Sequence, residues 1–292
     1  MTVFTPTYNR ATVISRTFES LQQQKSRDFE WLIVDDGSTD NTEAIVTGFQ
    51  RHSTFPIRYY KVPHGGKHRA YNAGLKLAIG ELFFVVDSDD SLTKDSLLTI
   101  NSVAETLRDR KDICGIIALK ENKDGAIYGM PMPHEPVINS LKEFLDCCKD
   151  GERSFVFKTE IARKYPFPEI EGEYFVTESV VYERLGKDWG FLIINESLTI
   201  CEYQSDGLSS NIYNLMLANP IGYMIYHCQR IENSKSLIQA IRHTLRYVAF
   251  NSISKSRTQW GKYDGEYRWI VNLLTPVGKI GECYYKYRCR QN

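Results

Sequence analysis

The sequence has no long hydrophobic run and no CxxC pair. Its 292 residues include no window of about 18 consecutive apolar residues, so we expect no membrane-spanning helix. The first residues, Met-Thr-Val-Phe-Thr-Pro, contain neither a basic nor an apolar segment, so we expect no signal peptide. The seven cysteines are odd in number and lack zinc-site spacing, which favours reduced thiols in a cytoplasmic protein.

Signatures of several enzyme classes are also missing. The absence of GxGxxG argues against a dinucleotide-binding fold of that type. Gly65–Arg69 precedes a predicted helix, but a P-loop would need an earlier glycine, and Ser or Thr in place of His68. No Ser-His-Asp or Cys-His set can be assembled. The six histidines show no ligand spacing, so none of them is assigned a role.

The composition is that of a globular protein with an uneven distribution of charge. Hydrophobic residues make up 42% and charged residues 25%, which allows a sizeable core and excludes global disorder. The formal net charge is zero. From Cys228 to the end, however, there are 12 Lys and Arg against 4 Asp and Glu, whereas the remainder has 24 against 32. An acidic body is therefore joined to a basic tail.

The first half of the chain alternates strand and helix patterns. Helical spacing predicts helices at 11–23, 41–49, 67–79 and 94–107. Apolar runs predict strands at 3–5, where Pro6 ends the run, and at 29–34, 57–62, 81–86 and 113–119. This order predicts an α/β fold with a mostly parallel, doubly wound sheet. In such sheets, ligands bind beyond the carboxyl ends of the strands.

The second half is less regular. Its patterns predict strands at 155–157 and 191–194 and helices at 139–148, 175–185 and from 211 almost to 257, with breaks near 220 and 233.

Three of the predicted strand ends carry polar, mostly acidic residues: Thr5–Asn9, Asp35–Asp36 and Asp87–Asp90. The three carboxylates within 87–90 would repel one another in a low-dielectric cleft, and a divalent cation would remove that cost. Oxygen ligands suit Mg²⁺ or Mn²⁺. The alternative is a solvated turn whose aspartates cap the next helix. The position directly after a buried strand favours the metal.

The other strand ends allow both structural and binding roles. Asp35–Ser38 fits a strand-to-helix turn in which Gly37 supplies an unusual φ, and it also offers a carboxylate to a ligand ring N–H. The two adjacent aspartates can divide these tasks. Tyr8 either stacks on a nucleobase, a contact worth about 1–3 kcal/mol, or packs beneath the sheet edge. Lys67 and Arg69 could neutralise phosphate near a helix N-terminus.

Taken together, these motifs resemble the inverting glycosyltransferases of family 2, which have the GT-A fold. The matching segments are Val3–Arg10, Trp31–Asp40, Gly66–Lys67, Asn72–Gly74 and Phe84–Asp90, and they span roughly the first hundred residues. The resemblance implies a nucleotide-sugar donor, usually UDP-linked, and a divalent cation, Mn²⁺ or Mg²⁺.

Carried over by position, the resemblance also implies roles for single residues. Asp36 would accept a hydrogen bond from the uracil ring, and Lys67 would lie near the base or the phosphates. Asp87–Asp89 would be the DXD-type motif, with Asp87 toward the ribose and Asp89 on the metal. Asp90 is the next metal-side candidate. The donor-binding set is Thr5, Pro6, Tyr8, Asp36, Lys67, Asp87 and Ser88.

The segment Glu171–Glu178 resembles the part of the family that supplies the catalytic base. Glu178, at the start of an apparent helix, is the candidate, with Glu171 and Glu173 as rivals. A helix-start glutamate stabilised by the helix dipole is the structural alternative. Glu202–Ser209 resembles bacterial cell-surface members of the family, although the chain departs from members with a late histidine metal ligand.

These expectations define a domain plan and a reaction. Residues 1–210 would form the GT-A catalytic domain, with a donor half at 1–120 and an acceptor half at 121–210. Residues 211–292 would be a helical, basic extension. The enzyme would transfer a sugar with inversion to a glycan or lipid-linked acceptor hydroxyl in polysaccharide or cell-envelope synthesis.

Two other functions are alternatives to this reaction. A non-catalytic nucleotide-sugar-binding partner subunit would have no need for the carboxylates at the strand ends. A sugar nucleotidyltransferase would need a glycine-rich N-terminal loop, which 5–10 lacks.

The basic tail has two interpretations. It could hold the enzyme against anionic lipid at the inner face of the membrane, near a lipid-linked acceptor, or form a solvated helical face. The apolar runs at 215–217 and 223–226 fit a core, an oligomer surface or a membrane contact. Nucleic-acid binding is not expected, because the basic excess lies outside the candidate site and the body is acidic.

Overall fold

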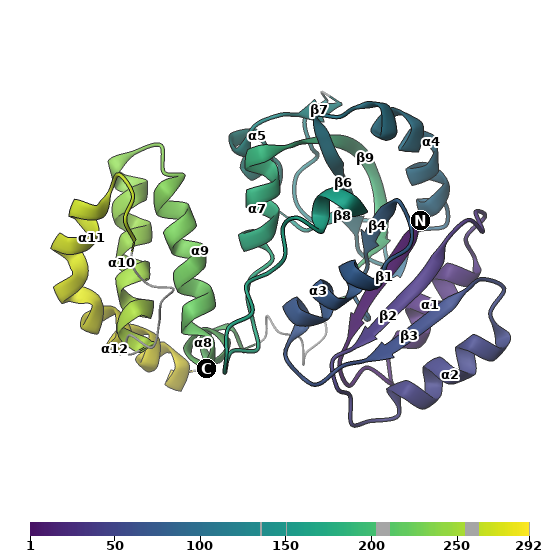
Figure 1. Cartoon of the computed structure of the whole chain (residues 1–292), viewed down its shortest axis with the longest axis horizontal. Coiled ribbons are helices and arrows are strands. Elements are labelled where there is room, and N and C mark those ends of the chain that lie inside the picture. The colour runs from purple at the N-terminus through teal and green to yellow at the C-terminus, as the bar shows by residue number, and fades with distance from the viewer. Residues whose placement is uncertain (135, 150, 203–210, 255–262, 292) are drawn as a thin grey trace. The chain divides into compact units, whose positions relative to one another are not determined.

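The computed structural model describes residues 1–134, 136–149, 151–202, 211–254 and 263–291, and Figure 1 shows the whole chain. The chain divides into two compact units. The sheet unit consists of Met1–Pro166 and Val181–Gln204, and the helical unit consists of Phe167–Val180 and Ser205–Asn292. The predicted division into a catalytic domain (1–210) and an extension (211–292) assigns a function to each part, and it stays a prediction.

In the described residues, the sheet unit is built on a nine-stranded mixed sheet of order β3-β2-β1-β4-β8-β6-β9-β5, with β7 paired to β9. Strands β3, β2, β1 and β4 are parallel, as are β6 and β9, and the other pairings are antiparallel. The strands are β1 (Thr2–Thr7), β2 (Glu30–Asp35), β3 (Ile57–Lys61), β4 (Leu82–Val85), β5 (Ser91–Leu92), β6 (Ile113–Glu121), β7 (Val137–Ile138), β8 (Arg153–Lys158) and β9 (Gly190–Ile200).

Helices connect the strands, as in other α/β folds. They are α1 (Ile14–Gln22), α2 (Thr42–His52), α3 (Lys67–Leu77), α4 (Ser96–Asp109), α5 (Leu141–Cys147), α6 (Thr159–Ala162) and α7 (Ser179–Asp188). The four strands β1 to β4 alternate with helices and are parallel, because each crossover helix returns the chain to the same end of the sheet. The predicted fold class is therefore confirmed for the sheet and its flanking helices.

The central strands are buried because helices cover both faces of the sheet. On one face, Trp31 of β2 packs near Phe18 of α1 and Phe49 of α2, and the centroids of the stacked Phe18 and Phe49 rings are 4.1 Å apart. On the other face, Phe4 of β1 meets Tyr71 of α3 edge to face. Every residue of β1 and β2 is buried, which explains why these strands are apolar runs with no alternation.

The prediction that Pro6 ends the first strand is wrong, since β1 continues to Thr7. The Phe4 carbonyl accepts a bond from the β4 side, and the Thr7 carbonyl accepts one from the β2 side. Backbone groups two residues apart in a strand face the same neighbour, so an N–H at Pro6, like the Phe4 carbonyl, would point toward β4. The pairing with β4 ends at Phe4, so a proline is tolerated two residues later.

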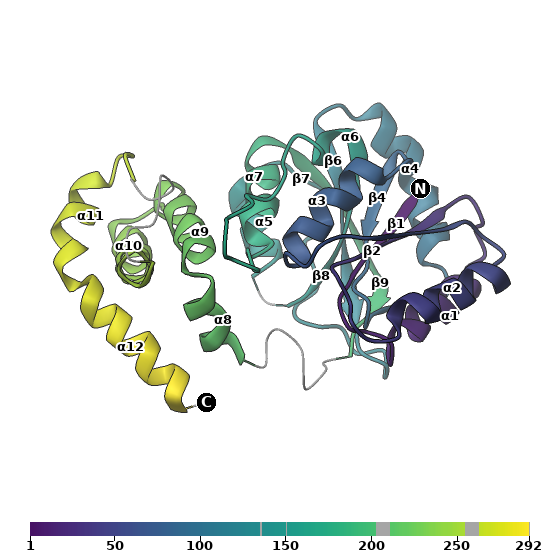
Figure 2. The same cartoon turned by 60° about the horizontal axis from the view of Figure 1, so that its bottom comes forward.

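The helical unit contains α8 (Ile212–Ala218), α9 (Pro220–Glu232), α10 (Leu237–Ile253), α11 (Arg268–Leu274), the 3₁₀ turn η2 (Thr275–Val277) and α12 (Gly278–Gln291). The predicted breaks near 220 and 233 are confirmed. In Figure 2, α10 is seen nearly end-on, with α9 on one side and α11 and α12 on the other. None of the described helices is long and apolar enough to span a bilayer.

Gly74 allows α3 to lie close to β1, and this contact gives a test of the packing. A Cβ at Gly74 would lie 2.2 Å from the Phe4 ring, whereas a Cβ at Gly48 in α2 would meet nothing within 4 Å. We expect Gly74→Ala to lower the free energy of unfolding by about 1–3 kcal/mol, because the buried ring cannot move aside freely. The matched control Gly48→Ala should raise it by about 0.5–1 kcal/mol through helix propensity. Urea denaturation measures both, and equal effects would contradict the packing.

Candidate functional site

The carboxyl ends of β1, β2 and β4 bring three of the sequence motifs to one edge of the sheet. Strand β1 lies between the other two and is parallel to both. Backbone hydrogen bonds continue past the strands, from Asp36 N to Thr7 O (2.8 Å) and from Val86 N to Phe4 O (2.9 Å). The motifs that begin at 5, 35 and 87 therefore lie together at the edge where α/β folds bind ligands.

The adjacent aspartates Asp35 and Asp36 have different partners. Asp35 accepts hydrogen bonds from Ser38 N (2.6 Å) and from the Tyr59 hydroxyl (2.5 Å), so it fixes the turn after β2. Asp36 accepts from the backbone N–H groups of Gly65–Gly66 (2.7 and 2.8 Å), and so ties β2 to the loop before α3. Asp36 is buried, and with His64 Nδ1 also 2.9 Å from its Oδ2, about one of the four carboxylate lone pairs remains for a ligand.

Tyr8 presents an exposed ring beside Asp36. It is 42% exposed and stacks on His64, with the ring centroids 4.3 Å apart and the planes 19° from parallel. His64 Nδ1 lies 2.9 Å from Asp36 Oδ2. Tyr8 therefore does not pack beneath the sheet edge, the structural alternative for this residue. No histidine was assigned a role from the sequence, and the glycines that follow His64 were the one available signal.

Two glycines give this edge its shape. Gly37 has φ +81°, the unusual value that the sequence predicted, and a Cβ there would lie 2.9 Å from His64 N. Gly66 has φ +96° and stands directly before α3. Because glycine adopts positive φ without steric cost, the loop backbone can reach the Asp36 carboxylate.

Lys67, the first residue of α3, neutralises part of the acidic motif. Its Nζ lies 2.6 Å from Asp87 Oδ1. Burial raises the pKa of Asp87, but the charges of Lys67, Lys120 and Arg10 outweigh burial and hold that pKa below its ordinary value. Arg10, at the end of the first motif, is a second residue to which the sequence analysis gave no role.

Asp89, the predicted metal ligand, is partly buried near the charge of Asp87. Burial and then the charge of Asp87 raise the pKa of Asp89, and Arg10 and Lys67 offset this rise only in part. A nearby cation would stabilise its ionised form. Among the described residues, no group of three or more His, Cys, Asp or Glu could hold a metal. Mg²⁺ is often held by one or two carboxylates together with phosphate oxygens, and metal binding at Asp89 stays a prediction.

Asp90 is engaged in a buried ion pair. Its Oδ2 lies 2.8 Å from Lys120 Nζ, and Glu152 Oε2 lies 3.6 Å from the same nitrogen. Burial by itself lowers the pKa of Lys120, but Asp90, Asp87 and Glu152 reverse this effect and raise it, so Lys120 stays charged. The ion pair with Lys120 thus ties the acidic turn to β6. A metal-binding role for Asp90 stays a prediction.

Three residues of the predicted donor set are buried in the framework. The Thr5 hydroxyl accepts a hydrogen bond from Trp31 Nε1 (2.9 Å), while Pro6 lies within β1 and Ser88 is buried in the acidic turn. Donor contacts by these three stay predictions. Thr7, which the sequence analysis did not single out, has a buried hydroxyl with no hydrogen-bond partner among the described residues, and it lies at the end of β1.

The three glutamates proposed as catalytic bases are in different environments. Glu173 is buried, and its carboxylate accepts from Ile221 N (2.6 Å) and Gly222 N (2.8 Å), so it caps the start of α9. Glu171 is exposed. Glu178 is also exposed and directly precedes α7. All three belong to the helical unit, and the choice of Glu178 as base stays a prediction.

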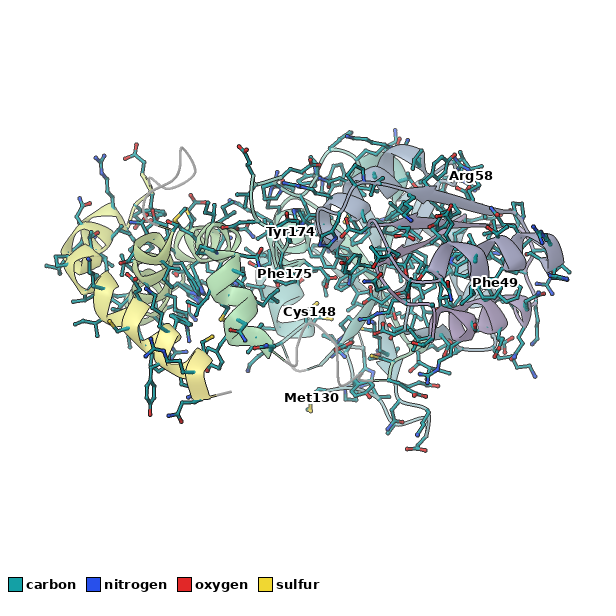
Figure 3. All side chains as sticks on the ribbon, turned by 90° about the horizontal axis from the view of Figure 1, so that it is seen from below. Phe49, Arg58, Met130, Cys148, Tyr174 and Phe175 are labelled. Atoms are coloured by element: carbon teal, nitrogen blue, oxygen red, sulfur yellow. The ribbon has the colours of Figure 1, made fainter. Side chains whose placement is uncertain are left out.

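The helix predicted at 175–185 begins later, at Ser179. Before it, the backbone N–H groups of Tyr174 and Phe175 (Figure 3) donate to Asn219 Oδ1 at 2.7 and 2.9 Å, which holds this stretch out of the helix. Of the later segment at 202–209, only Glu202 is described, and its carboxylate pairs with Arg16 (3.1 Å). The rest of that segment lies outside the described residues.

The pair of Lys120 and Asp90 can be tested by removing its cation. Lys120→Met would leave the Asp90 carboxylate buried without its partner, so we expect the free energy of unfolding to fall by about 3–5 kcal/mol. The double variant Lys120→Met/Asp90→Asn should recover part of that loss, because no buried charge remains. Urea denaturation followed by tryptophan fluorescence measures both. A single variant within about 1 kcal/mol of wild type would mean that water, and not Lys120, solvates Asp90.

Comparison with known proteins gives this geometry a context. The chain is 28% identical to the GalNAc(5)-diNAcBac-PP-undecaprenol beta-1,3-glucosyltransferase of Campylobacter jejuni, over 74% of this chain and 71% of that protein. It is 23% identical to the poly(ribitol-phosphate) beta-N-acetylglucosaminyltransferase TarP of Staphylococcus aureus, over 98% of this chain and 91% of TarP.

A solved structure and a family model complete the comparison. The crystal structure of S. aureus TarS 1–349 in complex with UDP-GlcNAc superposes with a TM-score of 0.58 and 18% identity, covering 97% of this chain and 87% of TarS 1–349. This likeness supports the fold. The family model "Glycosyl transferase family 2" matches residues 2–165, which include all the strand-end motifs described above. The chain therefore belongs to glycosyltransferase family 2.

Proposed function

We propose that this protein is a metal-dependent inverting glycosyltransferase that moves a sugar from a UDP-sugar to an acceptor hydroxyl. The observation that carries the proposal is the meeting of Tyr8, Asp36 and Asp89 at one sheet edge. An exposed aromatic ring, a carboxylate with a spare lone pair and an incompletely neutralised carboxylate match a base, a ring N–H and a cation-bound diphosphate.

Donor binding follows from these contacts. Tyr8, supported by His64, offers a flat face for the base, and Asp36 accepts from the N3–H of uracil. Lys67 and Arg10 place positive charge beside the diphosphate, and the Thr7 hydroxyl is available for a polar contact. The UDP-GlcNAc in the TarS crystal structure supports a uridine-linked donor.

Turnover requires a leaving group and a base. Mn²⁺ or Mg²⁺ held at Asp89 would neutralise charge on the departing diphosphate. Glu178 takes the proton from the acceptor hydroxyl as that oxygen attacks the anomeric carbon from the face opposite the leaving group. A single displacement of this kind inverts the configuration. Glu173 is a weaker candidate for this role, because its carboxylate is already bound to the start of α9.

The relatives suggest the acceptor and the setting. One is named for an undecaprenol-linked oligosaccharide and another for poly(ribitol-phosphate). We therefore infer a glycan or lipid-linked acceptor in cell-envelope polysaccharide synthesis, with the reaction on the cytoplasmic side. A non-catalytic binding subunit is the second hypothesis, and no observation in the structure favours it.

The base can be identified by comparing two exposed glutamates. We expect Glu178→Gln to lower the rate of UDP release by roughly 10²–10⁴-fold, because the variant cannot take a proton. UDP affinity, measured by calorimetry, should stay near the wild-type value. Glu171→Gln, an isosteric change in the same segment, is the control and should keep full activity. The opposite result, with Glu171→Gln inactive and Glu178→Gln active, would make Glu171 the base.

The metal site can be tested by combining a substitution with chelation. We expect Asp89→Ala to lower sugar transfer by roughly a hundredfold or more and to make the residual rate insensitive to added Mn²⁺. Wild-type protein treated with EDTA should lose activity and regain it with Mn²⁺ or Mg²⁺. Asp124→Ala, in an exposed turn, is the control. If Asp89→Ala keeps full transfer while the metal is chelated, Asp89 holds no catalytic metal.

A further inference from the structure

An exposed apolar stripe runs along α11 and α12 in the helical unit. One side of these helices is buried within the unit, at Ile270, Val271, Gly278 and Tyr285. The residues that are exposed and apolar or aromatic define the outer stripe: Trp269, Leu273, Ile280, Tyr284 and Tyr287. In Figure 2, both helices lie on the side of α10 opposite to α9. The outer stripe is therefore a surface that the described helices of this unit leave uncovered.

The outer stripe lies on two helices that η2 separates, so its spacing holds within each helix only. Trp269 and Leu273 are four residues apart in α11, and Ile280, Tyr284 and Tyr287 are four and three residues apart in α12. Side chains at these spacings lie on one face of a helix. Each helix therefore presents one exposed apolar face.

Positive charge lies directly beside the outer stripe. Lys279, Lys286 and Arg290 are exposed on α12, next to apolar positions in the sequence, and Lys286 also pairs with Glu282 (2.6 Å). Across 211–254 and 263–291 there are 9 Lys and Arg against 4 Asp and Glu. The first half of α10 has the same mixture, with exposed Ile241 and Leu245 each followed by an exposed arginine. Two copies of such a face would bring like charges together, which opposes self-association.

We propose that the outer stripe binds the surface of a bilayer that contains anionic lipid. Trp and Tyr favour the level of the headgroups, the aliphatic side chains enter the boundary of the acyl chains, and the flanking cations meet anionic headgroups. The sequence left open whether the basic tail binds lipid or is solvated. The exposed apolar residues of the outer stripe, next to cations, favour lipid binding. The idea requires neither donor binding nor turnover, so it stands or falls separately from the proposed reaction.

The test is vesicle co-sedimentation of the full chain. The vesicles are phosphatidylcholine alone, or phosphatidylcholine with roughly 30% phosphatidylglycerol. We expect binding to the anionic vesicles only, weakened when the ionic strength rises from roughly 0.05 to 0.5 M. Ile280→Glu, at a residue that is 71% exposed, should weaken binding about tenfold or more. The matched control Ile79→Glu, at an isoleucine of the sheet unit that is 75% exposed, should bind like wild type.

Charge and self-association provide the remaining controls. Lys279→Gln/Arg290→Gln should weaken binding to anionic vesicles and remove part of its salt dependence. Circular dichroism of Ile280→Glu should match wild type, since the side chain is exposed. The proposal is overturned if wild type ignores anionic vesicles, or if Ile280→Glu binds as well as wild type. It is also overturned if light scattering shows a wild-type oligomer that Ile280→Glu converts to a monomer while vesicle binding is absent.

Discussion

The candidate site depends on how negative charge is balanced at one edge of the sheet. Three carboxylates follow β4 within four residues, and burial makes each of them costly to ionise. Lys67 neutralises Asp87, and Lys120 neutralises Asp90 from within the sheet. Burial and the charge of Asp87 raise the pKa of Asp89, and burial raises the pKa of Asp90 to about 6 although Lys120 lies 2.8 Å away. The contacts of Asp87 and Asp90 with lysines help to fix the turn, and metal binding at Asp89 stays a proposal.

The same edge is held together by backbone groups as much as by side chains. Asp36 binds two consecutive amides of the loop before α3, and the positive φ of Gly66 allows that loop to approach. His64 contacts this carboxylate and stacks on Tyr8, so the position of an exposed aromatic ring depends on a carboxylate that directly follows β2. The proposed base-binding position is therefore held by contacts between the segments that follow β1 and β2 and the loop before α3.

The helical unit needs residues that pack and cap its helices, and it also carries exposed apolar residues beside cations. Its interior needs capped, closely packed helices, and Glu173 provides one cap by binding the start of α9 from a distant segment. Its surface carries apolar and cationic residues side by side on α12, an arrangement that solubility alone would not favour. A lipid-linked acceptor and an anionic bilayer would explain why one unit needs both a glutamate-bearing segment and an amphipathic face.

The sequence by itself determined the order of the longer strands and helices, the placement of acidic motifs at strand ends and the positive φ of Gly37, because periodicity and turn chemistry act over a few neighbouring residues. It missed the short elements β5, β7 and α6, which span too few residues to show a period. The sequence wrongly predicted that Pro6 ends the first strand. A proline fits within β1 because the pairing with β4 has already ended at Phe4. Only the tertiary structure decided that Lys120 neutralises Asp90, that His64 stacks on Tyr8 and that Glu173 caps α9. Each of these contacts joins residues about 30 to 56 positions apart. Such partners are chosen by strand register and helix packing, and no local pattern records them.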